Sequence, residues 1–172
     1  EPPAFPEPSA TLVLLREGPA SLEVLLLERN PRSGFIPGAW VFPGGRVDAS
    51  DGDPLLLTRV LGLSPEEAEA RLGPRESGPK ALAYWVAAVR ETFEETGILL
   101  AGHPARSGEA GRDGPGGGGS ASLREEVPDG EIISAQERLL TGESSFLAVL
   151  ETLDRTLNAT GIRYIGHWLT PE

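Results

Sequence analysis

Two apolar runs open the chain. Residues 10–16 and 21–29 are rich in Leu and Val, and Gly18 and Pro19 lie between them. Apolar strand-like runs joined by a Gly-Pro turn are typical of a β-hairpin. Segment 34–45 carries too many Gly and Pro for a helix, and we expect a short strand at 40–42 followed by a tight turn at Gly44-Gly45.

The most regular pattern lies between residues 80 and 96. At the 100° step of an α-helix, Leu82, Val86, Val89 and Phe93 fall on one apolar stripe, and Gly97 follows as a stop signal. This predicts a helix over 80–96 whose stripe faces the core.

Cap signals predict shorter helices around it. Asp53-Pro54 and the Ser64–Glu67 capping box indicate two short helices within 51–78. Ser134 with Glu137 resembles a further capping box. We therefore expect helices at 134–140 and 144–157, and strands at 98–101 and 162–169.

The length of 172 residues suits one domain with a core of its own. We expect a disordered tail at 1–9, a helical insertion at 49–78 and a flexible Gly-rich loop at 102–121, where almost nothing is available to bury. The predicted class is α/β.

Composition excludes several classes of function. The chain has no Cys, which removes disulfide scaffolds, cysteine nucleophiles and zinc knuckles. Its net charge of -11 repels a phosphate backbone, so we expect no nucleic-acid partner. No apolar run is long enough to cross a membrane, and no secretory signal opens the sequence, so we expect a cytoplasmic protein without a membrane partner.

An acidic cluster ends the predicted helix. Glu91, Glu94 and Glu95 fall on one helix face, away from the apolar stripe. Like charges at these spacings repel, and they oppose the helix dipole. A hard divalent cation relieves both penalties, so the pattern favours a Mg²⁺ or Mn²⁺ site over the alternative, a solvated acidic surface.

These residues resemble the Nudix hydrolases. Residues 42–45 (Phe-Pro-Gly-Gly) look like the opening of the Nudix box, and 90–98 like its second half, with Thr92 at a position that is usually apolar. The extra residues 49–78 separate the two halves. The first Glu of the box has two candidate positions: counting forward from Gly45 reaches Asp51, and counting back from Arg90 reaches Leu82.

An interrupted box of this kind is similar to the acyl-coenzyme A diphosphatases of the type-nineteen group. Matching segments are 24–29, 38–48, 90–95 and 167–171. The resemblance implies a Nudix α/β/α sandwich with a mixed sheet. In that group further sheet and a last helix follow the final segment, so we expect a chain truncated at its C-terminus.

The resemblance also implies a mechanism, in which a metal-activated water attacks a phosphorus of a nucleoside diphosphate linked to another group. Glu91, Glu94 and Glu95 are then metal ligands, Gly44 adds its carbonyl, and Gly44 and Gly45 form the turn that binds the cofactor. Arg90 orients a carboxylate by a salt bridge, and Glu91 is the candidate general base. A coenzyme A or acyl-coenzyme A diphosphate is the favoured substrate over an oxidised nucleotide or a dinucleotide.

Two alternatives to this enzyme stay open: a non-catalytic Nudix-like binding or regulatory module, and an inactive fragment. A homodimer is a further expectation from the family. Several other side chains have both a functional and a structural interpretation. His167 is a substrate contact or a structural residue; Trp40 and Phe35 stack on a base or fill core; Arg29, Arg32 and Arg46 meet phosphates or solvent.

Overall fold

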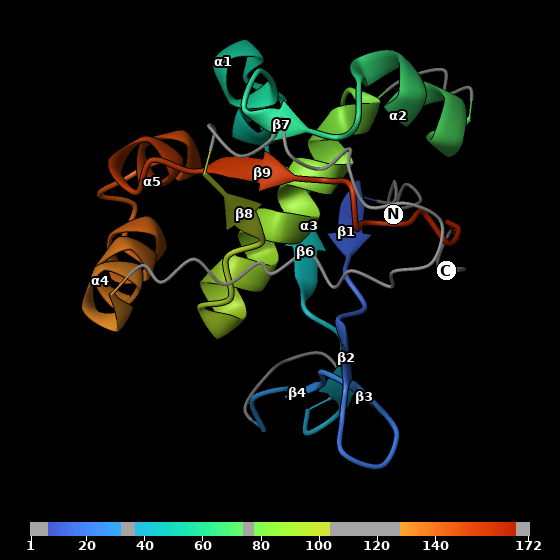
Figure 1. Ribbon diagram of the computed structural model, residues 1–172, viewed down its shortest axis with the longest axis vertical. Helices are drawn as coiled ribbons and strands as arrows, with labels where there is room; N and C mark the ends of the chain where they lie inside the picture. The colour runs from blue at the N-terminus through green and yellow to red at the C-terminus, as the bar shows by residue number, and fades with distance from the viewer. Residues whose placement is uncertain (1–6, 32–36, 74–77, 104–127, 168–172) are drawn as a thin grey trace, which may run out of the picture.

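The computed structural model describes residues 7–31, 37–73, 78–103 and 128–167. Helix α3 (Ala81–Thr96) runs through the middle of the helical part of the molecule, and the other helices and several of the strands lie around it (Figure 1). Its predicted apolar stripe is almost completely buried, with Leu82, Val86, Val89 and Phe93 each at most 2% exposed. The predicted helix and its inward face are confirmed. Burial of this stripe stabilises α3 more than helix propensity does.

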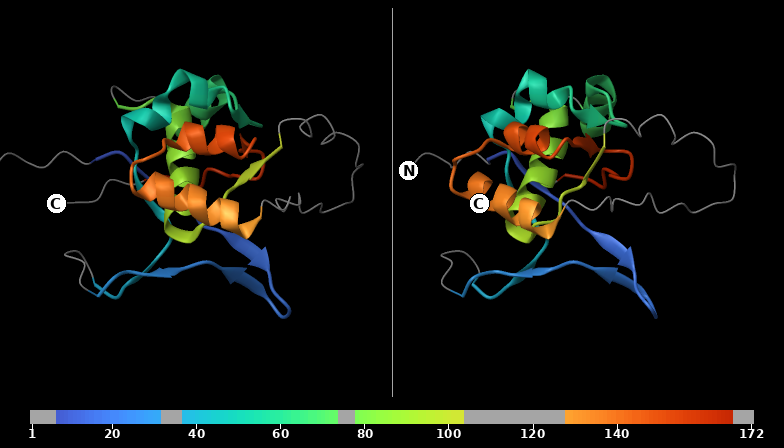
Figure 2. Two further views of the ribbon diagram at one scale, coloured as in Figure 1. Left: turned by 90° about the vertical axis from the view of Figure 1, so that its left-hand side faces the viewer. Right: turned by 60° about the vertical axis from the view of Figure 1, so that its left-hand side comes forward.

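The N-terminal residues form short antiparallel strand pairs. Strands β2 (Leu15–Glu17) and β3 (Leu22–Val24) are the expected hairpin, and Gly18 N donates to Ser21 O at 3.0 Å in its turn. Strands β4 (Leu27–Glu28) and β5 (Trp40–Val41) pair next to it, which confirms a strand in 40–42. Figure 2 shows this arm of strands reaching away from the helices.

The expected Gly44-Gly45 turn is wrong. These glycines belong to strand β6 (Gly44–Arg46), which pairs antiparallel with β1 (Ser9–Thr11). Ser9, assigned to the tail, therefore belongs to a strand. A Cβ at Gly44, whose φ is +153°, would collide with the backbone of Ala10 and Thr11, so Gly lets the two strands approach closely.

Both short helices predicted from their caps are present. In α1 (Pro54–Leu57) the Asp53 carboxylate accepts from Leu55 N at 2.7 Å, and in α2 (Pro65–Leu72) Ser64 and Glu67 form the capping box. A 3₁₀ turn, η1 (Ala49–Gly52), precedes them. Strand β7 (Val60–Leu61) lies between them and was not predicted, because two residues leave no pattern to detect.

The C-terminal elements are β8 (Ala101–Gly102), α4 (Asp129–Leu140), α5 (Phe146–Thr152) and β9 (Thr156–Asn158). Strand β9 pairs parallel with β7 and antiparallel with β8, so this small sheet is mixed. The elements predicted from the sequence match the observed ones less well in this part of the chain than near α3.

Four expectations are corrected in this part of the chain. Helix α4 begins at Asp129, so Ser134 lies inside it and is not a cap. Helix α5 ends at Thr152, because the backbone turns at Asp154 (φ +49°) into β9. The strand expected at 98–101 starts only at Ala101, where β9 provides a partner.

The last corrected element is the strand expected at 162–169, since residues 162–167 have no strand pairing. Residues 168–169 lie outside the described part of the chain, as do 104–127, which hold most of the expected Gly-rich loop, and residues 1–6 of the expected tail.

The core lies on two sides of α3. Val86, Val89 and Phe93 pack with α5 and β9, while Leu82 and Trp85 pack with Leu63, Ala68 and Ala159 around the insertion. Helices and mixed strands around one core confirm the α/β class. In the ranges that the structure describes, no helix is both long and apolar enough to cross a membrane.

Candidate active site

The acidic cluster lies in the last two turns of α3. Gly97 ends the helix in the left-handed conformation (φ +73°), and its N–H donates to Phe93 O at 2.8 Å. Because only Gly adopts this conformation without strain, the sequence fixes the end of the helix there. Glu91, Glu94 and Glu95 are therefore held on a rigid element with its core side fully packed.

Arg90 binds the cluster from within the protein. It is 5% exposed, and its Nη1 donates to Glu91 Oε1 at 2.9 Å and to Glu94 Oε1 at 3.1 Å. The expected salt bridge from Arg90 to a carboxylate of the box is present. Burial opposes the charge of Arg90, but the carboxylates of Asp51 and Glu94 outweigh it and raise the pKa of Arg90.

The other half of the guanidinium binds Asp51 and strand β6. Nε and Nη2 donate to the two Asp51 oxygens at 2.8 and 3.0 Å, and Nη2 also donates to Arg46 O at 2.9 Å. Asp51 is fully buried. Of the two candidate positions for the first acidic residue of the box, Asp51 is the partner of Arg90, while Leu82 lies in the apolar core.

Glu91 lies against Gly45 of strand β6. A Cβ built at Gly45 would lie 2.5 Å from the Glu91 carboxyl, so only Gly leaves room for this carboxylate. Burial raises the pKa of Glu91, the Arg90 charge opposes that rise, and Glu94 and Glu95 add to it. A half-buried carboxylate with a raised pKa is a candidate proton acceptor.

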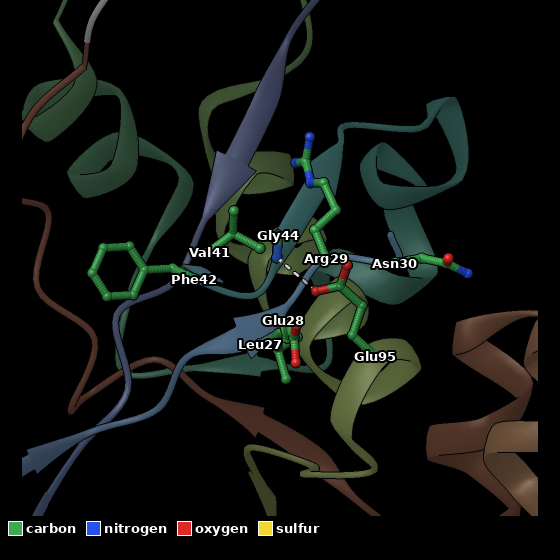
Figure 3. Close-up of a pocket in the computed structure, with 8 residues that line it drawn as sticks. All are labelled: Leu27, Glu28, Arg29, Asn30, Val41, Phe42, Gly44 and Glu95. Atoms are coloured by element: carbon green, nitrogen blue, oxygen red, sulfur yellow. Dashed lines mark hydrogen bonds between the residues drawn. The ribbon is translucent and has the colours of Figure 1, made fainter. Parts of the chain in front are cut away.

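Glu95 connects the helix to a pocket. Its Oε2 accepts from Gly44 N at 3.1 Å, a bond that joins α3 to β6 across 51 residues of sequence (Figure 3). Glu95 and Gly44 form one side of a pocket of about 360 Å³. The remaining lining residues come from β4, β5 and their flanks: Leu27, Glu28, Arg29, Asn30, Val41 and Phe42.

The pocket combines two kinds of lining. Leu27, Val41 and Phe42 are apolar, while Glu28, Arg29 and Asn30 bring charged and polar groups. Ligand sites commonly combine apolar walls with a few polar groups that fix orientation. The position of Glu95 at its edge puts the acidic cluster within reach of a bound molecule.

The oxygen donors fit a hard divalent cation. In ranges 7–31, 37–73, 78–103 and 128–167, no three His, Cys, Asp or Glu side chains gather tightly enough to hold a metal by themselves. Mg²⁺, however, takes one or two protein carboxylates and fills its other positions with water and substrate phosphate. Glu91 lies against Gly45, and Glu95 accepts from Gly44 N, so the two carboxylates lie beside the same short backbone segment and suit that mode of binding.

The other candidate residues from the sequence fall into those that line the pocket, those that do not, and those outside the described residues. Arg29 lines the pocket. Trp40 is 65% exposed and does not line it, and the Arg46 side chain pairs with Glu7 at 2.9 Å. The His167 ring contacts Tyr164 Oη at 2.5 Å and does not line the pocket. Phe35 and Arg32 lie outside the described residues.

Sequence reasoning missed most of the pocket. The spacing from Gly45 indicated Asp51 as the first acidic residue of the box, although the spacing from Arg90 left Leu82 as an alternative. Leu27, Val41 and Asn30 carried none, because the pairing of β4 with β5 brings them together.

Comparison with known proteins places these features in a family. Residues 8–172 match the model of the NUDT19 Nudix domain. The chain is 32% identical to an acyl-coenzyme A diphosphatase NUDT19 of Gallus gallus over 90% of its own length, and 31% identical to that of Homo sapiens over 99%. A crystal structure of a NUDIX hydrolase from Alicyclobacillus acidocaldarius superimposes with a TM-score of 0.66 and 26% identity.

These relatives are longer than the chain. It spans 44% of the Gallus gallus protein and 46% of the Homo sapiens protein. The match to the bacterial structure covers 97% of this chain and 63% of the bacterial chain. The similarity therefore covers almost all of this chain, and about half of the curated proteins it matches.

Proposed function

The chain belongs to the Nudix hydrolase superfamily, in the NUDT19 subfamily, with the Nudix α/β/α fold, and we propose that it hydrolyses the diphosphate of coenzyme A or an acyl-coenzyme A. The reaction class is the cleavage of a nucleoside diphosphate linked to another group. The proposed substrate follows the names of the Gallus gallus and Homo sapiens relatives, which are acyl-coenzyme A diphosphatases.

One observation carries the proposal: the Gly44 N–H donates to Glu95 at the edge of the pocket. This bond joins the acidic end of α3 to the strand that lines the pocket. A ligand bound in the pocket meets the carboxylates of Glu28 and Glu95 and the side chain of Arg29. A diphosphate with an organic group on each end matches this division into charged and apolar surface.

The proposed metal ligands come from Glu91, Glu94, Glu95 and the carbonyl of Gly44, with one or two of the carboxylates on a given Mg²⁺ or Mn²⁺ ion and water and substrate phosphate at its other positions. When bound, such a cation neutralises diphosphate charge and lowers the pKa of a coordinated water. Arg90 restrains Glu91 and Glu94 through Nη1, and Asp51 in turn holds Arg90 in place. The carboxylates are thereby oriented before a substrate arrives, which reduces the cost of ordering them.

In the proposed reaction the oxygen of a water molecule bonds to one phosphorus, and the bridging P–O bond of the diphosphate breaks. Two phosphate monoesters result, one carrying each organic group. Glu91 is the proposed general base that accepts the proton of the water, because its pKa is raised by burial. Arg29 is proposed to bind a phosphate oxygen at the pocket rim.

The test is hydrolysis of coenzyme A, an acyl-coenzyme A, NADH, ADP-ribose and 8-oxo-dGTP, with and without Mg²⁺, by the wild type and by Glu95→Gln. We expect Mg²⁺-dependent release of two monoesters from the coenzyme A substrates. Glu95→Gln removes one charge at nearly constant shape and should lower kcat by about 100-fold or more.

Glu137→Gln, on the exposed face of α4, is the matched control and should retain wild-type turnover. Binding of coenzyme A without hydrolysis by a cooperatively unfolding wild type would replace the proposal with the binding-module alternative. A better substrate elsewhere in the panel would keep the reaction class and change the substrate.

A further inference from the structure

Gln136 of α4 contacts the end of α3 that carries the acidic cluster. Its Nε2 donates to Phe93 O at 3.1 Å and to Glu94 O at 2.9 Å. The two helices pack against each other, and Figure 2 shows α4 lying beside the C-terminal half of α3. Gln136 is therefore a side chain from one helix that caps another.

The two carbonyls differ in what else they bind. Phe93 O also accepts from Gly97 N at 2.8 Å, as expected at a helix end. In a continuing helix Glu94 O would accept from Ile98 N, but that N–H donates to Thr96 Oγ1 at 3.0 Å instead. The last carbonyls of a helix need donors from elsewhere. Gln136 supplies the donor for Glu94.

The place of this contact matters for the site. Glu94 is both the residue whose carbonyl Gln136 holds and the residue whose carboxylate binds Arg90 at 3.1 Å. Loosening of the last turn would shift Glu94 and Glu95 together, and with them the Glu95 bond to Gly44 N. Helix ends fray most easily, so an external donor at this carbonyl has a large effect on local order.

We propose that Gln136 is a positioning residue, which keeps the last turn of α3 ordered so that the acidic cluster is ready to bind a divalent cation and act on the diphosphate. This inference rests on the proposed function of the same cluster. Gln136 does not line the pocket, and its hydrogen bonds reach the backbone carbonyls of Phe93 and Glu94 rather than the carboxylates proposed to hold the cation. Its effect passes through the backbone of Phe93 and Glu94.

The test replaces the donor without changing the length of the side chain. Gln136→Met removes the N–H groups, Glu137→Met makes the same change on the exposed face of α4, and Gln136→Lys restores a donor at a helix C-terminus, where a cation is also favourable. Each protein is measured for thermal unfolding, for hydrogen exchange of the Gly97 amide, for Mn²⁺ affinity by electron paramagnetic resonance, and for kcat and KM.

In Gln136→Met we expect exchange at Gly97 to be about 10-fold faster. Mn²⁺ affinity and kcat should each fall by about 10-fold, with KM unchanged, as is typical when a group that orients metal ligands is lost. Gln136→Lys should recover most of these losses, and Glu137→Met should match the wild type. If Gln136→Met acted only by lowering the stability of the whole protein, kcat would not fall at constant KM, and Gln136→Lys would not recover the losses.

Wild-type exchange at Gly97 in a folded Gln136→Met would overturn the inference, and so would faster exchange with unchanged Mn²⁺ affinity and kcat. Exchange is measured without metal or substrate. If the wild type hydrolyses nothing in the panel, the proposed function fails, whereas the exchange and Mn²⁺ measurements still decide the role of Gln136. If the wild type binds no Mn²⁺ either, exchange at the Gly97 amide alone decides. Unchanged exchange in Gln136→Met then contradicts the inference, and faster exchange supports the part of it that says Gln136 orders the last turn of α3.

Discussion

Asp51 and Arg90 form a two-point ion pair inside the protein although they lie 39 positions apart in the sequence. Nε donates to Oδ1 at 2.8 Å and Nη2 to Oδ2 at 3.0 Å, with Asp51 fully buried and Arg90 5% exposed. The pair joins the 3₁₀ turn after β6 to the middle of α3. Through the other half of its guanidinium, Arg90 passes this restraint on to Glu91 and Glu94.

Removal of Asp51 should destabilise the fold strongly. Asp51→Ala leaves the buried guanidinium without its main counter-ion, and we expect the free energy of unfolding to fall by about 3–5 kcal/mol. Urea unfolding measures the change. Glu151→Ala, which breaks the half-exposed Arg59–Glu151 pair, should cost less, about 1 kcal/mol. Equal losses in the two variants would contradict a special role for the buried pair.

A methyl group at Gly45 should disturb the site more than the fold. Gly45→Ala puts a Cβ about 2.5 Å from the Glu91 carboxyl, so this flexible side chain must move away. We expect kcat to fall by about 10-fold or more with a modest change in melting temperature.

Gly130→Ala is the matched control for Gly45→Ala. Gly130 lies in α4 with open space around its Cα, so Ala should stabilise the protein by about 0.5–1 kcal/mol without affecting kcat. Full turnover in Gly45→Ala would show that the position of Glu91 does not limit the reaction.

Loss of the cation at the pocket rim should weaken substrate binding. Arg29→Ala removes a charge from the pocket lining, and we expect KM for coenzyme A to rise about 10-fold, equivalent to about 1.4 kcal/mol, with little change in kcat. Steady-state kinetics at two salt concentrations measure it. Arg16→Ala, on the β2–β3 hairpin and paired with Glu23, should keep the wild-type KM. The same KM in both variants would remove Arg29 from the proposed binding site.

Chelation should abolish turnover reversibly. Because the acidic cluster is proposed to hold Mg²⁺ or Mn²⁺, EDTA should stop hydrolysis and added Mg²⁺ should restore it. Bound cation should also raise the melting temperature of the wild type more than that of Glu95→Gln, since binding to the folded state alone stabilises it. Scanning calorimetry with and without Mg²⁺ compares the two, and an equal shift in both would place the cation elsewhere.

Local signals were reliable wherever a short stretch of chain determines its own structure. The 100° periodicity predicted α3 and its buried stripe, Gly97 predicted its end, and the Ser64–Glu67 box predicted α2. The same signals failed at Gly44-Gly45 and at Ser134. There the presence of a pairing strand, or of a helix that begins earlier, decided the outcome.

The sequence by itself determined that Glu91, Glu94 and Glu95 share one end of a helix, because helical geometry depends only on residue spacing. Only the tertiary structure decided what surrounds them: Asp51 rather than Leu82 behind Arg90, Gly45 against Glu91, Gly44 beside Glu95 and Gln136 on Glu94. These contacts join residues between 39 and 51 positions apart. Such long-range contacts follow from how the elements pack around α3, and packing leaves no mark in the local pattern of residues.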